Sequence, residues 1–104
     1  MTTDSDRLNS STKLNHIALV GLGSIGRRHL RLIKSLKPEM EITLVRSGKG
    51  KDWPESELAD QVVNNIDQAL GMGADAAILA SPSSMHLQQL TQWLNAGKPV
   101  MVEK

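Results

Sequence analysis

Short apolar runs alternate with amphipathic segments along most of this chain. The runs that predict β-strands cover residues 17–20, 41–45, 62–63, 76–80 and 100–102. Continuous apolar runs of this length are typical of parallel strands that are covered on both faces. We therefore expect a sheet in which the run at 76–80, which is apolar throughout, is a central strand.

The first helical pattern covers residues 24–36, and Pro38 ends it. The positions expected on its buried face are Ile25, Leu32, Ile33 and Leu36, with Leu30 at the border. Arg27 and Arg28 fall in its first turn, where a positive charge opposes the helix dipole. Two interpretations remain open: a bound anion offsets that cost, or both side chains lie in water.

The second helical pattern covers residues 84–96, with a serine available as the N-cap and Gly97 and Pro99 at its end. Its expected core stripe consists of Leu87, Leu90 and Leu94, widened by Trp93. Between the two patterns, residues 52–60 predict an irregular link or short helix, and residues 67–70 predict a brief helical turn.

Strands and helices alternate, and right-handed crossovers would arrange such strands in one parallel sheet. The predicted fold class is therefore α/β, a Rossmann-type doubly wound parallel sheet that stops after the fifth strand. Residues 1–15 are polar and lack an apolar period, which predicts a disordered leader. Residues 16–104 then form the nucleotide-binding domain.

The first strand leads directly into Gly21-Leu22-Gly23-Ser24-Ile25-Gly26, which has the spacing G-x-G-x-x-G. Gly21 permits a tight turn, Gly23 permits close approach of a pyrophosphate, and Gly26 permits the helix to pack against the strand. The helix N-terminus offers unpaired N–H groups to the phosphates. Because a strand precedes the motif and a helix follows it, the motif predicts dinucleotide binding, with Ser24 and Ile25 among the contacts.

The residue at the end of the second strand bears on the choice of cofactor. NAD-binding domains commonly carry Asp or Glu about 20 residues past the glycine motif, to bond the adenosine ribose. Arg46 stands there instead, followed by Ser47, Lys49 and Lys51. A guanidinium suits the 2′-phosphate of NADP, so NADP is favoured, with Ser47 as a further contact. The alternative is a solvated loop whose arginine stacks on the adenine of NAD.

Four features fall at the carboxyl ends of predicted strands: Gly21, Arg46, Ser81 and the pair Glu103-Lys104. Open parallel sheets bind their ligands at this edge. Four separate features at one edge are stronger support for a nucleotide site than the glycine motif alone.

The 104 residues carry a net charge of +1 and no cysteine. This charge balance gives no electrostatic footprint for nucleic acid or membrane, and no apolar run is long enough for a bilayer span or secretory signal. The absence of cysteine is compatible with a reducing compartment. We predict a cytoplasmic protein with no nucleic-acid partner, no membrane partner and no metal; the oligomeric state stays open.

Three segments together resemble a known family: residues 21–29, residues 80–86 (Ala80-Ser81-Pro82-Ser83-Ser84-Met85-His86) and residues 96–104. They are similar to the N-terminal domain of the glucose–fructose oxidoreductase and inositol dehydrogenase (Gfo/Idh/MocA) family. The resemblance implies an NAD(P)-dependent oxidoreductase that moves hydride between a nicotinamide and a hydroxyl-bearing carbon of a sugar or cyclitol. It also implies a second, substrate-binding domain that residues 1–104 do not include, so the chain alone is expected to be inactive.

The resemblance also implies roles for residues at the ends of the last two strands. Ser81, Pro82 and Ser83 stand where the family usually has Thr-Pro-Asn, with His86 at the position of its histidine, and all four are expected cofactor contacts. Helix packing or capping is an equal alternative for His86. Glu103 is expected beside the nicotinamide ribose.

By the same resemblance, Lys104 is the catalytic lysine, which would bond the reacting hydroxyl. The alternative is a lysine with no role. His29 is expected to pack near the phosphate loop. Two other functions remain in view for the whole chain. One is a non-catalytic nucleotide-binding or interaction module, and the other is an S-adenosylmethionine-binding domain, which leaves Glu103-Lys104 unexplained.

Overall fold

The computed structural model describes residues 15–46 and 53–103, and for Ser83 only its backbone. The predicted leader, apart from Asn15, lies outside the described residues. The predicted contributions of Ser47, Lys49, Lys51 and Lys104 also lie outside them.

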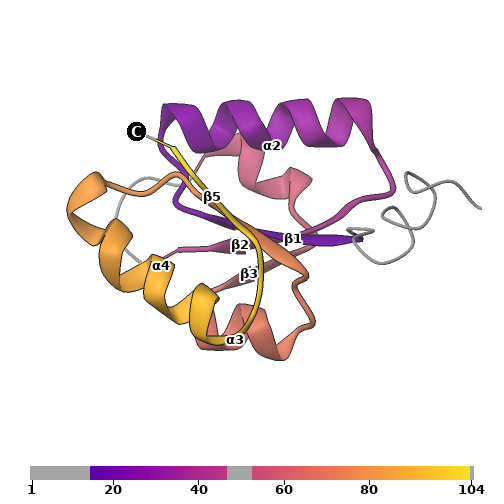
Figure 1. Cartoon of the computed structure of the whole chain (residues 1–104). Coiled ribbons are helices and arrows are strands. Elements are labelled where there is room, and N and C mark those ends of the chain that lie inside the picture. The colour runs from indigo at the N-terminus through magenta and orange to yellow at the C-terminus, as the bar shows by residue number, and fades with distance from the viewer. Residues whose placement is uncertain (1–14, 47–52, 104) are drawn as a thin grey trace, which may run out of the picture.

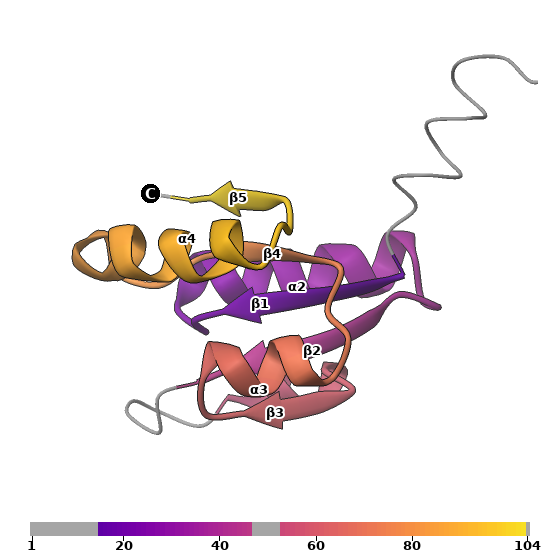
Figure 2. The same ribbon diagram turned by 60° about the horizontal axis from the view of Figure 1, so that its bottom comes forward.

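All strands of the described chain join one parallel sheet in the order β3-β2-β1-β4-β5. The strands are β1 (His16–Val20), β2 (Glu41–Val45), β3 (Gln61–Val63), β4 (Ala76–Leu79) and β5 (Val100–Val102). The chain moves outward from β1 to β3 and then crosses back to β4 on the other side of β1, with β3 and β5 at opposite edges (Figure 2). The carboxyl ends of β1 and β4 therefore flank the point where the direction of winding reverses.

Helices cover both faces of the sheet, as the doubly wound class requires (Figure 1). One face carries α2 (Ser24–Leu36), and the other carries α3 (Ile66–Gly71) and α4 (His86–Asn95). Two short 3-10 helices, η1 (Pro54–Leu58) and η2 (Ser83–Met85), complete the elements. The predicted fold is confirmed, and η1 provides the short helix expected within residues 52–60.

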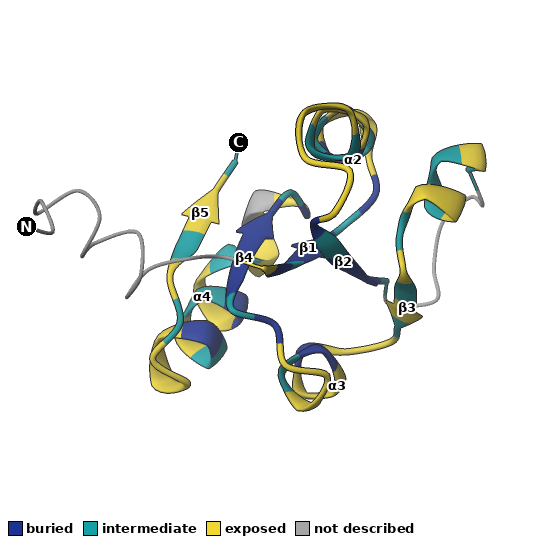
Figure 3. Ribbon diagram, turned by 90° about the vertical axis from the view of Figure 1, so that its right-hand side faces the viewer, coloured by how far each residue is buried: buried dark blue, intermediate teal, exposed yellow. Residues whose placement is uncertain are grey.

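Each face of the sheet has its own apolar core, and the central strands β1 and β4 are the most deeply buried (Figure 3). Ala18, Val20 and Leu79 pack toward α3 and α4 together with Trp93. Alternate residues of the same strands, such as Leu19 and Ile78, pack toward α2. This two-sided burial explains why the strands read as continuous apolar runs.

The predicted buried face of α2 is confirmed at Ile33 and wrong at Ile25, Leu32 and Leu36. Leu30, expected at the border, is completely buried, whereas Leu36 is 77% exposed and Leu32 is also exposed. The line of contact follows Gly26, Leu30 and Ile33, at i, i+4 and i+7. Gly26 sets this line, because a helix approaches a sheet most closely where it has no side chain.

The predicted stripe of α4 is confirmed at Leu90 and Trp93 and wrong at Leu87 and Leu94. Leu87 is 78% exposed and Leu94 is exposed, whereas Gln89 and Trp93 are buried one turn apart. Trp93 has the largest apolar surface of the helix to remove from water, and it is completely buried. The Gln89 amide oxygen accepts a hydrogen bond from the Ser81 hydroxyl. This bond offsets the free-energy cost of removing the Gln89 side chain from water.

Two carboxylates hold the strand starts at the opposite, amino edge of the sheet. Asp75 accepts hydrogen bonds from the backbone N–H groups of Asn15 and His16, both at 3.1 Å. Asp60 accepts one from the N–H of Ile42 at 2.7 Å, which together with the nearby Lys34 ammonium lowers the pKa of Asp60 below its ordinary value of 3.8. Asp75 and Asp60 thus both bind backbone N–H groups at this edge.

Candidate functional site

Gly21 ends β1 in a backbone conformation that requires glycine, with φ of +98°. A Cβ at this position would lie 2.8 Å from the backbone nitrogen of Ser81, so the ends of β1 and β4 meet here without side-chain space between them. The Gly21 N–H donates to the carbonyl oxygen of Val45 at 3.1 Å, which extends the β1–β2 pairing into the turn. The turn is therefore locked to the strands on both sides.

The other two glycines of the motif differ in what surrounds them. A Cβ on Gly26 would collide with the carbonyl oxygen of Gly21, so the helix packs against the turn only with glycine, as the motif predicts. A Cβ on Gly23 would meet no atom within 4 Å, and its φ of −75° suits any residue. The described protein therefore gives no steric reason for glycine at position 23, and the open space above it is where a ligand would approach.

A cavity of about 880 Å³ opens at the carboxyl edge, between the glycine turn and the ends of β2 and β4. Five predicted cofactor residues line it: Gly21, Gly23, Arg46, Ser81 and Pro82. Arg46 is the single charged side chain among the described lining residues. The volume lies within the range of sites that enclose a small-molecule ligand.

Several lining residues were not predicted from the sequence. They are Trp53 before η1, Asn64 and Asn65 before α3, and Met85, Gln88, Gln89 and Gln92 on the α4 side. Five of these seven residues carry amide side chains, which are polar and uncharged. An amide wall offers both donors and acceptors without fixed charge, which suits the polar edges of a nucleobase or ribose.

The residues after β4 form a compact hydrogen-bonded cluster. The Ser81 hydroxyl donates to the Gln89 side chain, and Nε2 of His86 donates to the Ser81 carbonyl oxygen at 2.6 Å. Because a carbonyl oxygen only accepts, His86 carries its proton on Nε2, and Nδ1 is the free acceptor when the ring is neutral. His86 therefore braces the turn that presents Ser81 and Pro82.

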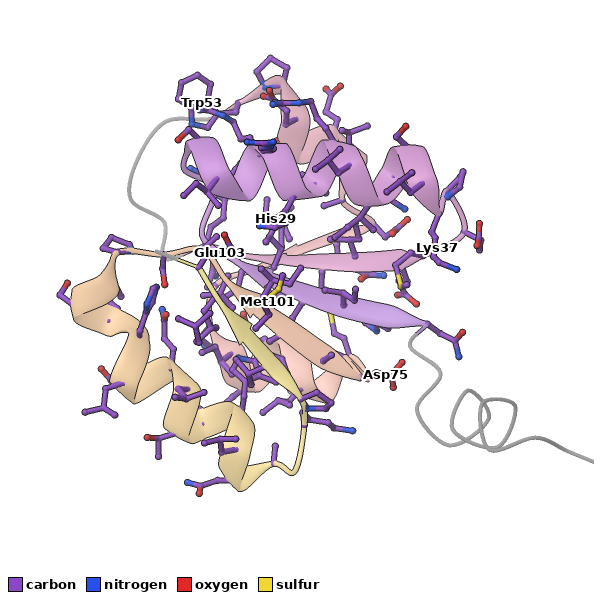
Figure 4. All side chains as sticks on the ribbon, turned by 45° about the horizontal axis from the view of Figure 1, so that its top comes forward. His29, Lys37, Trp53, Asp75, Met101 and Glu103 are labelled. Carbon is purple, nitrogen blue, oxygen red and sulfur yellow. The ribbon has the colours of Figure 1, made fainter. Side chains whose placement is uncertain are left out.

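Glu103 lies beside His29, with Oε2 and Nε2 separated by 3.6 Å (Figure 4). The Glu103 N–H donates to the Leu79 carbonyl oxygen at 2.9 Å, so Glu103 continues the β4–β5 pairing past the end of β5. His29 stands on the second turn of α2, facing the end of the sheet. The structure thus brings α2 and the end of β5 together through these two side chains, both partly buried.

The other predicted cofactor contacts whose side chains the structure describes are not among the residues that line the cavity. Ser24 and Ile25 stand in the first turn of α2, Gly26 packs against the glycine turn, His86 bonds the Ser81 carbonyl, and Glu103 pairs with His29. Within residues 15–46 and 53–103, no three His, Asp or Glu side chains gather in a group able to hold a metal ion. No helix in this part of the chain is long and apolar enough to cross a membrane.

The strand order, the glycine turn and the cavity at the winding reversal define a Rossmann-type dinucleotide-binding fold. The sequence model of the oxidoreductase family with an NAD-binding Rossmann fold, Gfo/Idh/MocA, matches residues 15–104. The chain belongs to this family, as its motifs predict.

Individual relatives agree with the family match. The chain is 35% identical over 91 residues to 4-carboxy-2-hydroxymuconate-6-semialdehyde dehydrogenase of Sphingobium sp., which covers 84% of this chain and 29% of that protein. It is 31% identical over 96 residues to inositol 2-dehydrogenase of Acidiphilium cryptum, covering 85% and 28%. The chain thus spans less than a third of the length of these relatives.

A solved structure supports the same placement. The WlbA dehydrogenase of Bordetella pertussis, in complex with NADH and UDP-GlcNAcA, superposes with a TM-score of 0.69 at 27% identity, over 85% of this chain and 28% of that one. The chain is therefore an NAD-binding Rossmann domain of an oxidoreductase family, and its relatives include inositol dehydrogenases and the WlbA dehydrogenase.

Proposed function

We propose that this chain binds the nicotinamide dinucleotide of an enzyme that moves hydride to or from a hydroxyl-bearing carbon of a sugar or cyclitol type substrate. The observation that carries the proposal is the cavity at the carboxyl edge, which the glycine turn and the end of β4 enclose together. The inositol dehydrogenases and the complex of WlbA with NADH and UDP-GlcNAcA support this substrate class.

The preferred cofactor in this proposal is NADP. Arg46 lines the cavity at the end of β2, and the described lining residues include no Asp or Glu that would bond a free ribose 2′-hydroxyl and repel a phosphate. A guanidinium binds phosphate through paired N–H groups, which favours a 2′-phosphorylated ribose. NAD is the alternative, supported by the family description and by the NADH in the WlbA complex.

Chemistry in this proposal takes place at the carboxyl ends of β4 and β5. Glu103 lies there next to His29, and Lys104 follows it in the sequence. An ammonium group beside the nicotinamide would donate a hydrogen bond to the substrate oxygen and stabilise the negative charge that develops on it. Ser24, Ile25 and Ser83 serve as further cofactor contacts near the phosphates and the end of β4.

Turnover also needs a substrate held against the nicotinamide in reactive geometry. The described residues supply one side of such a site, and the chain covers under a third of its relatives. We therefore assign the substrate pocket to polypeptide outside residues 16–104 and expect binding without turnover from this chain alone.

Calorimetric titration of the chain with NADPH and NADH tests the proposal, with Arg46→Asp and Arg28→Asp as matched charge reversals. Arg46 lines the cavity, whereas Arg28 is exposed on α2. The expected result is tighter binding of NADPH, lost in Arg46→Asp and retained in Arg28→Asp. Tighter binding of NADH would overturn the cofactor preference, and binding of neither would contradict the proposed function.

A further inference from the structure

Trp53 contacts the cavity and the first turn of α2 at the same time. Trp53 lines the cavity, and the guanidinium carbon of Arg27 lies 3.5 Å from the centroid of its ring. Figure 4 shows Trp53 beside the N-terminal end of α2. Its carbonyl oxygen accepts hydrogen bonds from the N–H of Ser56 at 3.0 Å and from the Ser56 hydroxyl at 2.8 Å. The indole is therefore held by its ring face and by its own backbone.

The segment that follows Trp53 is fastened along the same helix. Arg31 pairs with Glu55 at 2.7 Å, and Lys34 pairs with Asp60 at 3.0 Å. Arg31 stands one turn after Arg27, and Lys34 nearly one turn later, so all three cations face the segment in sequence order. Exposed ion pairs add little stability singly, but three contacts in a row fix where the segment lies.

Arg27 occupies an unfavourable position for helix stability. It stands in the first turn of α2, where a cation opposes the dipole, and that turn contains no acidic residue. Its Nη1 atom is buried with no hydrogen-bond partner among the described residues. The contact of Arg27 that offsets these costs is the stack on Trp53, since a guanidinium over an indole face is attractive. The favourable contact of Arg27 is therefore with the Trp53 ring, whereas its position in the first turn destabilises the helix.

The position of Trp53 decides which part of a dinucleotide it would meet. Trp53 follows the end of β2 and lines the cavity together with Arg46, on the side of the sheet away from β5 and Glu103. In this fold the end of β2 faces the adenosine ribose, and the nicotinamide lies toward β4 and β5. Indole rings stack on nucleobases through their π-faces.

We propose that Trp53 is a binding residue for the adenosine half of the nucleotide, and that Arg27 is a positioning residue that holds the indole in place. The inference rests on the proposed function, because it needs a nucleotide in this cavity. In this proposal Arg27 neither lies in water nor binds the anion itself. It acts on the nucleotide through Trp53.

Tryptophan fluorescence of the 104-residue chain tests the role of Trp53 directly. The chain has two tryptophans, and Trp93 is completely buried in the core. ADP carries the adenosine half, and nicotinamide mononucleotide carries the other half. We expect ADP, but not nicotinamide mononucleotide, to change the emission, and we expect Trp53→Phe to abolish the change. An ADP-bound chain, by calorimetry, whose emission stays unchanged would overturn the inference.

Arg27→Met and Arg28→Met test whether Arg27 acts by positioning Trp53 or only through its positive charge. Both remove one cation from the first turns of α2, but Arg27 stacks on the Trp53 ring whereas Arg28 is exposed. Arg27→Met should weaken ADP binding at least threefold and shrink the emission change, whereas Arg28→Met should leave both as they are. Equal effects of the two substitutions would refute the positioning role. Failure of ADP, NADH and NADPH to bind at all would contradict the proposed function together with this inference.

Discussion

Alanine substitutions at the three glycines of the turn should distinguish residues needed for stability from a residue needed for nucleotide binding. Gly21→Ala places a Cβ 2.8 Å from the backbone of Ser81 and forces alanine into a φ of +98°. Strain of this kind costs about 1–3 kcal/mol, and overpacking against a rigid backbone about 1–3 kcal/mol more. For a domain of this size, a loss of 1 kcal/mol lowers Tm by roughly 4–8 °C. Gly21→Ala should therefore lower Tm by more than about 8 °C.

Gly23→Ala should behave in the opposite way. The new Cβ meets nothing within 4 Å, and the φ of −75° is ordinary. Alanine is a poorer N-cap than glycine, which lowers stability, but it also reduces the entropy of the unfolded chain, which raises stability. Because these effects nearly cancel, the free energy of unfolding should change by less than about 1 kcal/mol. The methyl group would nevertheless occupy the space where a pyrophosphate approaches. We expect the nucleotide dissociation constant to rise at least about tenfold, which is about 1.4 kcal/mol.

The assay combines thermal unfolding, followed by circular dichroism without nucleotide, with calorimetric titration of NADPH. Gly26→Ala should resemble Gly21→Ala, because its Cβ would collide with the Gly21 carbonyl, although a gain in helix propensity of about 1 kcal/mol reduces the loss. The reasoning is refuted if Gly23→Ala lowers Tm by as much as Gly21→Ala, or if Gly23→Ala binds nucleotide as the unmodified chain does.

Three further predictions concern stability. Leu30→Ala should cost about 2–5 kcal/mol and Leu36→Ala less than about 0.5 kcal/mol in urea unfolding, because only Leu30 is buried; equal losses would contradict the assigned face of α2. Gln89→Leu should cost about 1–3 kcal/mol by leaving the Ser81 hydroxyl unpaired, while Gln88→Leu, at an exposed position, should be nearly neutral. Asp60 has a lowered pKa in the fold, so its stabilisation is present above pH 3.8 and is lost as pH falls through the lower folded value. Asp60→Asn should flatten that acid limb in unfolding curves measured from pH 5 to 2, and an unchanged slope would count against the hydrogen bond to Ile42.

The strand positions and the glycine turn were predictable because each has a local cause. Buried parallel strands must be apolar at every position, Gly21 has a positive φ, and a Cβ on Gly26 would collide with the carbonyl oxygen of the nearby Gly21. The confirmed family rests on the same short segments. Local pattern was therefore sufficient wherever the constraint came from residues adjacent in sequence.

The faces of the helices were not predictable in the same way. Leucines occur around much of α2 and α4, and the contact line depends on Gly26 in the first and on the Ser81–Gln89 hydrogen bond in the second. Trp53 reaches the cavity because α2 holds its segment, and His29 meets Glu103 only after the sheet has formed. Such contacts join residues far apart in sequence, so the periodicity of apolar residues within a helix or strand does not predict them.

A nuclear magnetic resonance titration of the 15N-labelled chain with NADPH tests the central claim most directly. The account predicts that the largest shifts fall on the backbone N–H groups of Gly21, Gly23, Arg46 and Ser81, which surround the cavity. The N–H groups of Asn15 and Ile42, at the amino edge, should stay where they are. Shifts centred on the amino edge, or no shifts at saturating nucleotide, would contradict the claim that this cleft binds the dinucleotide.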